Sequence, residues 1–281
     1  MNPAPRVPRH GLEHPAFSLL EPSVRARLLA LDHFPFPHEL RELARGVPNA
    51  ITPWFDFAEQ DPAELQEAGG FDRLLQRTRA VPTRAGSFHD LFGALIWLHF
   101  PALKTVIHHL QLEGHSSARS PVQNALTHLD ESGVLVLSSD EAIFRAITAL
   151  EWADVFWHKR GELQQTTRFL VFGHGLLDAL RDPHPRLMGK ALFARVTGEH
   201  LALTDSEFRV FVDGALARLL PGFLSEPARL LPLPVLGVPG WSAQQTRSYY
   251  DDERYFRSVR QRVSAPSALS TPSAPAWLVL D

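Results

Sequence analysis

The chain has 281 residues, of which 44% are hydrophobic and 21% are charged, and its formal net charge is −3. This length allows a full hydrophobic core. The near-balanced charge, with basic residues spread along the sequence, argues against an extended nucleic-acid surface. The sequence contains no cysteine. Disulfides, zinc–thiolate sites, cysteine-ligated iron–sulfur clusters and a cysteine nucleophile are therefore excluded.

Three regions are expected along the chain. Residues 1–13 form a flexible N-terminal segment, residues 14–258 a single globular domain, and residues 259–281 a Ser/Ala/Pro-rich tail whose closing WLVLD is apolar enough to dock or to bind a partner. The N-terminus has no apolar run of signal-peptide length. The longest apolar run, residues 91–100, is too short for a bilayer, which needs about 20 residues. We expect a cytoplasmic protein with no membrane partner, and the sequence predicts no oligomeric state.

Apolar spacing and end signals predict a series of helices. Proline precedes or opens several of them, and Gly69-Gly70 interrupts the third. The longest contains Pro101 and is expected to be kinked there. The predicted helices cover residues 23–31, 38–45, 63–79, 88–112, 121–129, 140–149, 167–180 and 205–220.

Strand signals are fewer. Residues 133–137 (GVLVL) and 189–196 are typical of strands, and residues 51–57 suit a short strand or an aromatic-anchored turn. The Pro-rich segment 232–241 is stiff and apolar, and we expect it to lie over the core as an extended strap with Trp241 inserted. The sequence thus predicts an α+β fold, mostly α-helical with a small β-sheet, in one compact domain with frayed termini.

The stretch 81–104 gathers polar residues at the start of the longest predicted helix. His89 and Asp90 fall in its first turn, where free N–H groups and the helix dipole favour negative charge. If this helix is continuous, a turn of about 100° per residue puts His89 and Lys104 on one mostly apolar face. Arg84, one loop back, is within reach of a carboxylate or a phosphate at the helix start.

These side chains suit acyl or phosphoryl chemistry. His89 would act as general base or metal ligand, Asp90 would orient or ligate, and Arg84 with Lys104 would hold a small anionic ligand. The same residues also allow an architectural reading, in which His89 and Asp90 cap the helix and bind Arg84. The predicted catalytic residues are His89, Asp90, Arg84 and Lys104, and the predicted substrate-binding residues are Thr83, Trp97, His174 and Trp241.

His174 is among these residues because a glycine stands on either side of it. Glycine costs a helix about 1 kcal/mol relative to alanine. Gly173 and Gly175 therefore indicate a close approach of the backbone to a ligand or to a neighbouring helix.

The other histidines indicate no further site, and the common catalytic and nucleotide-binding motifs are absent from the sequence. His108, His109 and His115 are not expected to bind a metal, because adjacent histidines on a helix point about 100° apart and His108 has no carboxylate three or four residues further on. The chain lacks a phosphate-binding GxxxxGK[ST] loop, a GxGxxG after a strand, HExxH, GxSxG and the kinase motif set. No metal ligands are predicted, and the cofactor stays unassigned.

Several motifs occur in an order that resembles one bacterial family. They are TR at 83–84, HDLF at 89–92, ALIW at 94–97, FP at 100–101, Lys104, FGHGLL at 172–177, PLPVLGVPGW at 232–241, YDD at 250–252 and YF at 255–256. On these residues the chain is similar to the family called domain of unknown function 3025, over roughly residues 35–257. The resemblance implies no particular activity.

The resemblance also marks three departures from the family pattern. Gly93 stands where relatives usually carry asparagine, and His108 and Gln111 stand where an asparagine and a histidine are usual. If these positions form a site with His89, the resemblance implies a modified site in this chain. The His…Asn…His order of relatives is similar to that of ββα-metal nucleases, although a long helix is a different frame for it.

The sequence is compatible with three functions. The first is a metal- or histidine-dependent hydrolase or nuclease-like enzyme acting on an anionic substrate. The alternative is a non-catalytic binding or assembly protein in which the His/Asp/Arg/Lys cluster is structural. The third is a small-molecule or nucleotide-binding protein that uses a cleft under the strap. An open cavity lined by His89, Arg84 and Lys104 favours the first, and a sealed, fully paired network favours the second.

Overall fold

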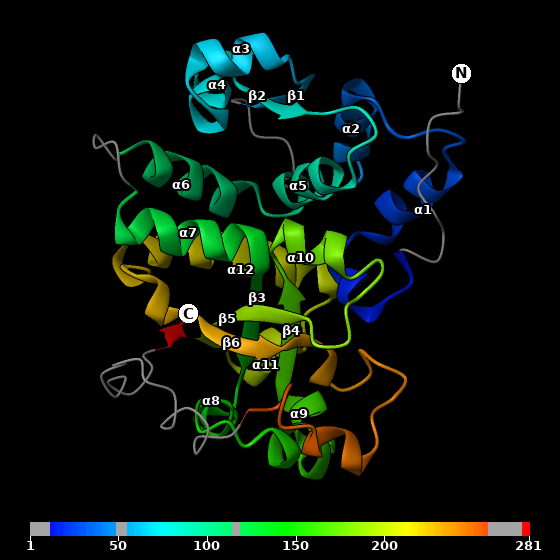
Figure 1. The fold of residues 1–281 in the computed structure, drawn as a ribbon, viewed down its shortest axis with the longest axis vertical. Helices are drawn as coiled ribbons and strands as arrows, with labels where there is room; N and C mark the ends of the chain where they lie inside the picture. Colours follow the sequence, from blue (N-terminus) through cyan, green and yellow to red (C-terminus); the bar gives the residue numbers. More distant parts are fainter. Residues whose placement is uncertain (1–11, 49–54, 114–118, 258–276) are drawn as a thin grey trace.

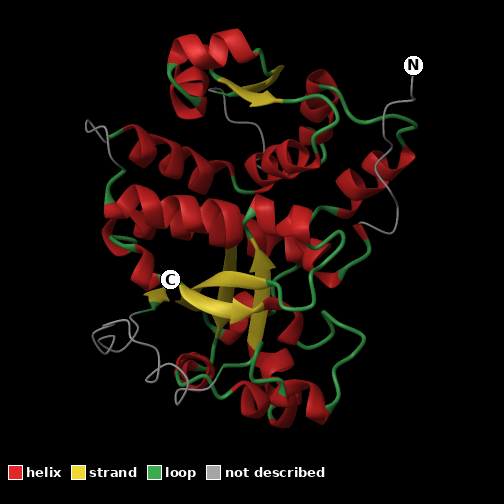
Figure 2. Cartoon of the chain, viewed as in Figure 1, coloured by secondary structure: helices red, strands yellow, loops and turns green. Residues whose placement is uncertain are grey.

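A five-stranded mixed sheet lies at the centre of the molecule, surrounded by helices (Figures 1 and 2). The computed structural model describes residues 12–48, 55–113, 119–257 and 277–281. The strands of this sheet are β3 Gly133–Ser138, β4 Thr167–Val171, β5 Met188–Arg195, β6 Leu231–Pro234 and β7 Leu278–Val279. β3 is antiparallel to β4 and parallel to β5, while β6 and β7 pair with opposite ends of β5. Every residue of β3 is buried, as expected of a central strand covered on both faces.

In the view of Figure 1, most of the helices lie above the strands of this sheet, and the others lie below them. The helices are α1 Pro22–Ala30, α2 Pro37–Ala44, α3 Pro62–Ala68, α4 Phe71–Thr78, α5 Phe88–His99, α6 Pro101–Leu112, α7 Pro121–Ser132, α8 Glu141–Thr148, α9 Arg160–Thr166, α10 His174–Ala179, α11 Gly198–Leu201 and α12 Asp205–Phe223. α7 and α10 lie next to the strands. α5 and α6 pack on α10 and α7, farther from the strands. The predicted α+β class and the small sheet are confirmed.

A small unit covers the outer side of α5 and α6 (Figure 1). Its two short strands, β1 Asp56–Glu59 and β2 Ala80–Thr83, pair in parallel around α3 and α4. The chain breaks between these helices at Gly69 and Gly70, which have φ of 77° and 126°, as the sequence predicted. β1 overlaps the segment 51–57, expected to be a strand or turn, only at residues 56–57, and residues 51–54 lie outside the described residues. β2 was not predicted.

The predicted helix over residues 88–112 is two helices, not one kinked helix. α5 ends at His99 and α6 begins at Pro101, with an angle of 113° between them. Proline cannot donate a hydrogen bond to the preceding turn. The next two N–H groups, of Ala102 and Leu103, are instead bound by the carboxylate of Asp213 at 3.0 and 2.8 Å. The expectation that His89 and Lys104 share one helix face is therefore wrong, because the two residues lie on different helices.

Asp213 should make the stability of the fold depend on pH. It is 5% exposed, and burial raises the pKa of its carboxyl from 3.8 to about 6, although the two N–H groups and Arg209 oppose the shift. The folded state therefore holds this proton more tightly than the unfolded state. The free energy of unfolding should fall by about 3 kcal/mol as pH rises from about 4 to about 6.

Chemical denaturation across this pH range checks the effect of Asp213. The contribution is the difference between the wild-type profile and that of Asp213→Asn, whose side chain does not titrate. A difference that stays constant from about pH 4 to about pH 7 would contradict the assignment.

The predicted helix over residues 167–180 is wrong in its first part only. Its first part forms β4, which pairs antiparallel with β3, and α10 begins only at His174. Thr167, Phe169 and Val171 favour a strand, and an unpaired β3 edge supplies the partner. A tertiary pairing thus overrides the helix-like apolar spacing of this segment.

The ends of the described chain belong to the core. Leu12 is 1% exposed, so the flexible N-terminal segment does not extend to it, while residues 1–11 lie outside the described residues. The closing WLVLD docks, which was one of the two outcomes expected for it, so this end of the predicted tail belongs to the globular domain: Leu278 and Val279 form β7, and Leu280 is buried. The rest of the predicted tail, residues 259–276, also lies outside the described residues.

No single helix among the described residues is long and apolar enough to cross a membrane. α5 and α6 reach that length and composition only as a pair bent by 113°.

Candidate functional site

A cavity of about 260 Å³ lies between α5, α6, α7, α10 and the small outer unit. Six of the predicted site residues line it: Arg84, His89, Asp90, Trp97, Lys104 and His174. The 113° turn between α5 and α6, and not a shared helix face, brings His89 and Lys104 to the same space.

Two predicted substrate-binding residues lie elsewhere. Thr83 is 3% exposed, and its hydroxyl donates to the carbonyl of Val81. Trp241 is inserted into the core, as expected, but it packs against His14 and Phe169. No residue of the strap 232–241 lines the cavity.

His89 and His174 meet at the wall of the cavity. Their Nε2 atoms are 3.1 Å apart, and the ring planes are inclined by 61°. His89 stands in the first turn of α5 and is half-buried, whereas His174 begins α10 and is buried. Two imidazole nitrogens at this distance share either one proton or one bound ion.

Glycines allow α10 to approach the end of α7 closely enough to form this contact. A Cβ at Gly173 would lie 2.4 to 2.6 Å from backbone atoms of Ser132 and Gly133. A Cβ at Gly175 would lie 2.6 Å from Oε2 of Glu131. The close backbone approach predicted from the glycines around His174 is therefore present, and its neighbour is the C-terminal turn of α7.

That turn contributes two carboxylates, of Asp130 and Glu131, which were not predicted from the sequence. Asp130 Oδ1 lies 3.7 Å from Nδ1 of His174 and 2.5 Å from Nζ of Lys104. Glu131 Oε1 lies 3.7 Å from Nε2 of His174. One signal for them was available, because acidic residues in the last turn of a helix oppose its dipole and require nearby positive charge.

Lys104, Asp130 and His174 form a chain of charges in which Lys104 and His174 are buried and Asp130 is half-buried. Lys104 is 5% exposed, with its ammonium 5.2 Å from the ring centroid of Trp97. Burial alone would raise the pKa of Asp130, but Lys104 and His174 hold it well below its usual range. Burial likewise would lower the pKa of His174, but Asp130 and Glu131 outweigh it and raise this pKa.

Arg84 and Asp90 bind each other on one side of the cavity. The guanidinium donates to both carboxylate oxygens at 2.8 and 2.7 Å, and the Arg84 backbone N–H donates at 2.7 Å. Burial raises the pKa of Asp90, but Arg84 and Ser87 together lower it below its usual range. This pair fits the architectural alternative, since Arg84 already holds a carboxylate.

The residues that line the cavity do not carry an excess of positive charge. Among the described residues that line it are three cations, Arg84, Lys104 and Arg119, and four carboxylates, Asp72, Asp90, Asp130 and Glu131. Lys104 and Arg84 are paired with carboxylates, whereas the hydrogen bond of Arg119 goes to Thr127 at 3.3 Å. The expectation that Arg84 and Lys104 hold an anion directly is thus weakened by their pairing.

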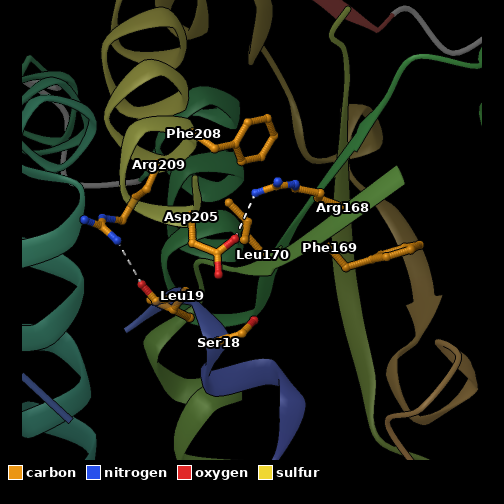
Figure 3. A pocket seen from close by; sticks show the side chains of 8 residues that line it. All are labelled: Ser18, Leu19, Arg168, Phe169, Leu170, Asp205, Phe208 and Arg209. Atoms are coloured by element: carbon orange, nitrogen blue, oxygen red, sulfur yellow. Dashed lines mark hydrogen bonds and ion pairs between the residues drawn. The ribbon is translucent and has the colours of Figure 1, made fainter. Parts of the chain in front are cut away.

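A second cavity, of about 240 Å³, lies beside β4 and α12 (Figure 3). Arg168 pairs there with Asp205 at 3.0 Å, and Arg209 donates to the carbonyl of Leu19. None of its lining residues was predicted as a site residue.

Comparison with protein families gives one match, to the family described as protein of unknown function (DUF3025), over residues 55–260. The chain belongs to this family. No curated protein and no solved structure matches it.

The DUF3025 match includes every residue that lines the first cavity. Gly93, His108 and Gln111, where the sequence departs from the expected family pattern, line this cavity too. His108 lies between Asp72 and Gln76, and a Cβ at Gly93 would contact His174 at an ordinary 3.6 Å. The contact between His89 and His174 therefore forms without a contribution from the three departing side chains. His115, from the histidine group considered above, lies outside the described residues.

Proposed function

We propose that this DUF3025 protein is a hydrolase-type enzyme that acts on a small anionic substrate at the His89–His174 pair. One observation carries the proposal: the two Nε2 atoms lie 3.1 Å apart, on different helices, at the wall of a cavity. Histidine is the side chain best suited to proton transfer near neutral pH.

The environments of the two rings differ, which supports different roles. His89 is half-buried and borders the cavity, so it is the member that can take a proton from an attacking water molecule. His174 has the Asp130 carboxylate on its Nδ1 side, which favours the charged ring. Its proton can pass to the leaving group of the substrate, so that one proton enters the pair and one leaves.

A non-catalytic binding or assembly role is the second candidate. The Arg84–Asp90 and Lys104–Asp130 pairs are complete within the chain, as in a network that fixes a fold. His174 argues against a purely architectural network. Its Nδ1 is buried without a hydrogen-bond partner among the described residues, since Asp130 stands at ion-pair distance.

A cytoplasmic location and the lack of an extended nucleic-acid surface remain predictions from the sequence.

Hydrolysis of chromogenic esters tests the proposal. Nitrophenyl phosphate and bis-nitrophenyl phosphate represent anionic substrates, and nitrophenyl acetate is a neutral comparison, each assayed with and without added divalent metal. We expect turnover of an anionic ester that falls about 10²- to 10⁴-fold in His89→Gln, because a general base is removed. His109→Gln, an exposed histidine of α6 outside the cavity lining, is the matched control. Equal rates for the wild type and His89→Gln on every ester would contradict the proposal.

A further inference from the structure

We infer that His89, His174 and Glu131 form a binding site for a divalent transition-metal ion, for which zinc is the best match. The inference deepens the proposed function by naming the ion that the site would use. With the ion bound, the Nε2 atoms of His89 and His174 would be its ligands, and the ion would replace His89 in activating the attacking water. The inference rests on the same cavity, but not on that cavity being catalytic.

The spacing of the three side chains matches a single ion. Their ligand atoms all lie within 4.8 Å of one another, with 3.1 Å between the two Nε2 atoms and 3.7 Å between His174 Nε2 and Glu131 Oε1. Tetrahedral zinc with ligand bonds of about 2.0–2.2 Å separates neighbouring ligand atoms by about 3.3–3.6 Å. The observed 3.1 and 3.7 Å distances lie on either side of that spacing.

The donor set suits zinc and leaves a position open. Two imidazoles with one carboxylate are typical of catalytic zinc sites, in which a water molecule or a substrate takes the fourth position. His89 borders the cavity and Glu131 has a side chain that is 48% exposed, so the open position would face the cavity. Imidazole also binds iron and nickel, so zinc affinity has to be compared with the affinity for these metals.

The surroundings of the three side chains support a built site. Histidine ligands of metals usually have a carboxylate behind the ring nitrogen that does not bind the ion. Asp130 occupies this place beside His174, and Lys104 holds Asp130. Gly175 leaves the space in which the Glu131 carboxylate lies, since a Cβ there would be 2.6 Å from its Oε2.

A bound divalent ion would also change the net charge of the cavity from negative to positive. The cations that line it are outnumbered by carboxylates, and two of the three are paired with them. An ion with two positive charges reverses this balance at the point where the histidines meet. An anionic substrate would then bind to the ion, with Arg119 as the additional cation.

Metal titration of the full chain tests the inference. The chelator-treated protein is titrated with zinc by calorimetry and with cobalt(II) by visible absorption, with nickel and iron(II) for comparison. We expect one zinc per chain. Zinc affinity should fall by more than 100-fold in His89→Gln, His174→Gln and Glu131→Gln. In Asp130→Asn, which removes the carboxylate behind His174, it should fall by about 10- to 100-fold. His109→Gln should bind as the wild type does.

Glu131→Gln keeps the test meaningful if a histidine variant fails to fold, because this side chain is half exposed. Absence of stoichiometric zinc binding, or equal affinity in the wild type, Glu131→Gln and a folded histidine variant, would overturn the inference. Stoichiometric binding without turnover of any ester would leave the metal site standing and contradict the proposed function. Turnover of an ester by a protein that binds none of the metals stoichiometrically would do the reverse.

Discussion

Adding one methyl group at Gly173 should lower the free energy of unfolding by about 3 kcal/mol or more. The Cβ of Gly173→Ala would lie 2.4 Å from the backbone nitrogen of Gly133 and 2.5 Å from that of Ser132. Backbone atoms cannot turn aside as a side chain can. The junction of α7, β3 and α10 would have to open, and the Gly133 carbonyl would lose its hydrogen bonds from the N–H groups of Phe172 and Gly173.

Gly161→Ala is the matched control for this substitution. Gly161 lies within α9, and a Cβ there would meet nothing within 4 Å. The same change should leave stability unchanged or raise it by up to about 1 kcal/mol, because alanine favours a helix. Urea denaturation of both variants measures the effect. Equal stability of Gly173→Ala and Gly161→Ala would contradict the close approach on which the position of His174 depends.

Replacing Asp130 by asparagine should destabilise the fold by about 3 kcal/mol. The Lys104 ammonium, with its side chain 6% exposed, would remain buried without its counter-charge, and the Trp97 ring would be a weaker partner. Asp130 itself is about one-fifth exposed, which moderates the cost. Chemical denaturation gives the difference in the free energy of unfolding.

The double variant Lys104→Met/Asp130→Asn separates an architectural role from a functional one. Removing both charges avoids the unpaired ammonium, so stability should recover most of what Asp130→Asn loses. Zinc affinity and ester turnover should stay low, because His174 still lacks its carboxylate. Recovery of metal binding together with stability would show that Asp130 serves only to neutralise Lys104.

The position of the site could be predicted from the sequence better than its geometry. His89 in the first turn of a helix and His174 between two glycines both indicated the cavity they line. Their contact could not be predicted, because it depends on the packing of α10 against α5 and on the pairing of β4 with β3. The place of Lys104 could not be predicted either, because it depends on the 113° turn after His99, where Asp213 from α12 binds the start of α6.

The roles of the charged residues were the least predictable part. Arg84 and Lys104 were expected to hold an anion, but each is bound to a carboxylate. The partner of Lys104 is 26 residues away along the chain, so no local pattern links the two. Thr83 and Trp241 fell within motifs of the family resemblance, yet they lie in the core away from the cavity. Motif membership therefore indicated contact with the cavity at six of the eight predicted site residues and only burial at the other two.

The most direct measurement is an anomalous diffraction map, recorded at the zinc absorption edge from crystals grown with zinc. The metal-centre account predicts one peak at about 2.0–2.2 Å from Nε2 of His89, Nε2 of His174 and a carboxylate oxygen of Glu131. It also predicts that Asp130 stays on the Nδ1 side of His174. Absence of a peak between the two histidines, or zinc bound only at other histidines such as His108, would contradict it.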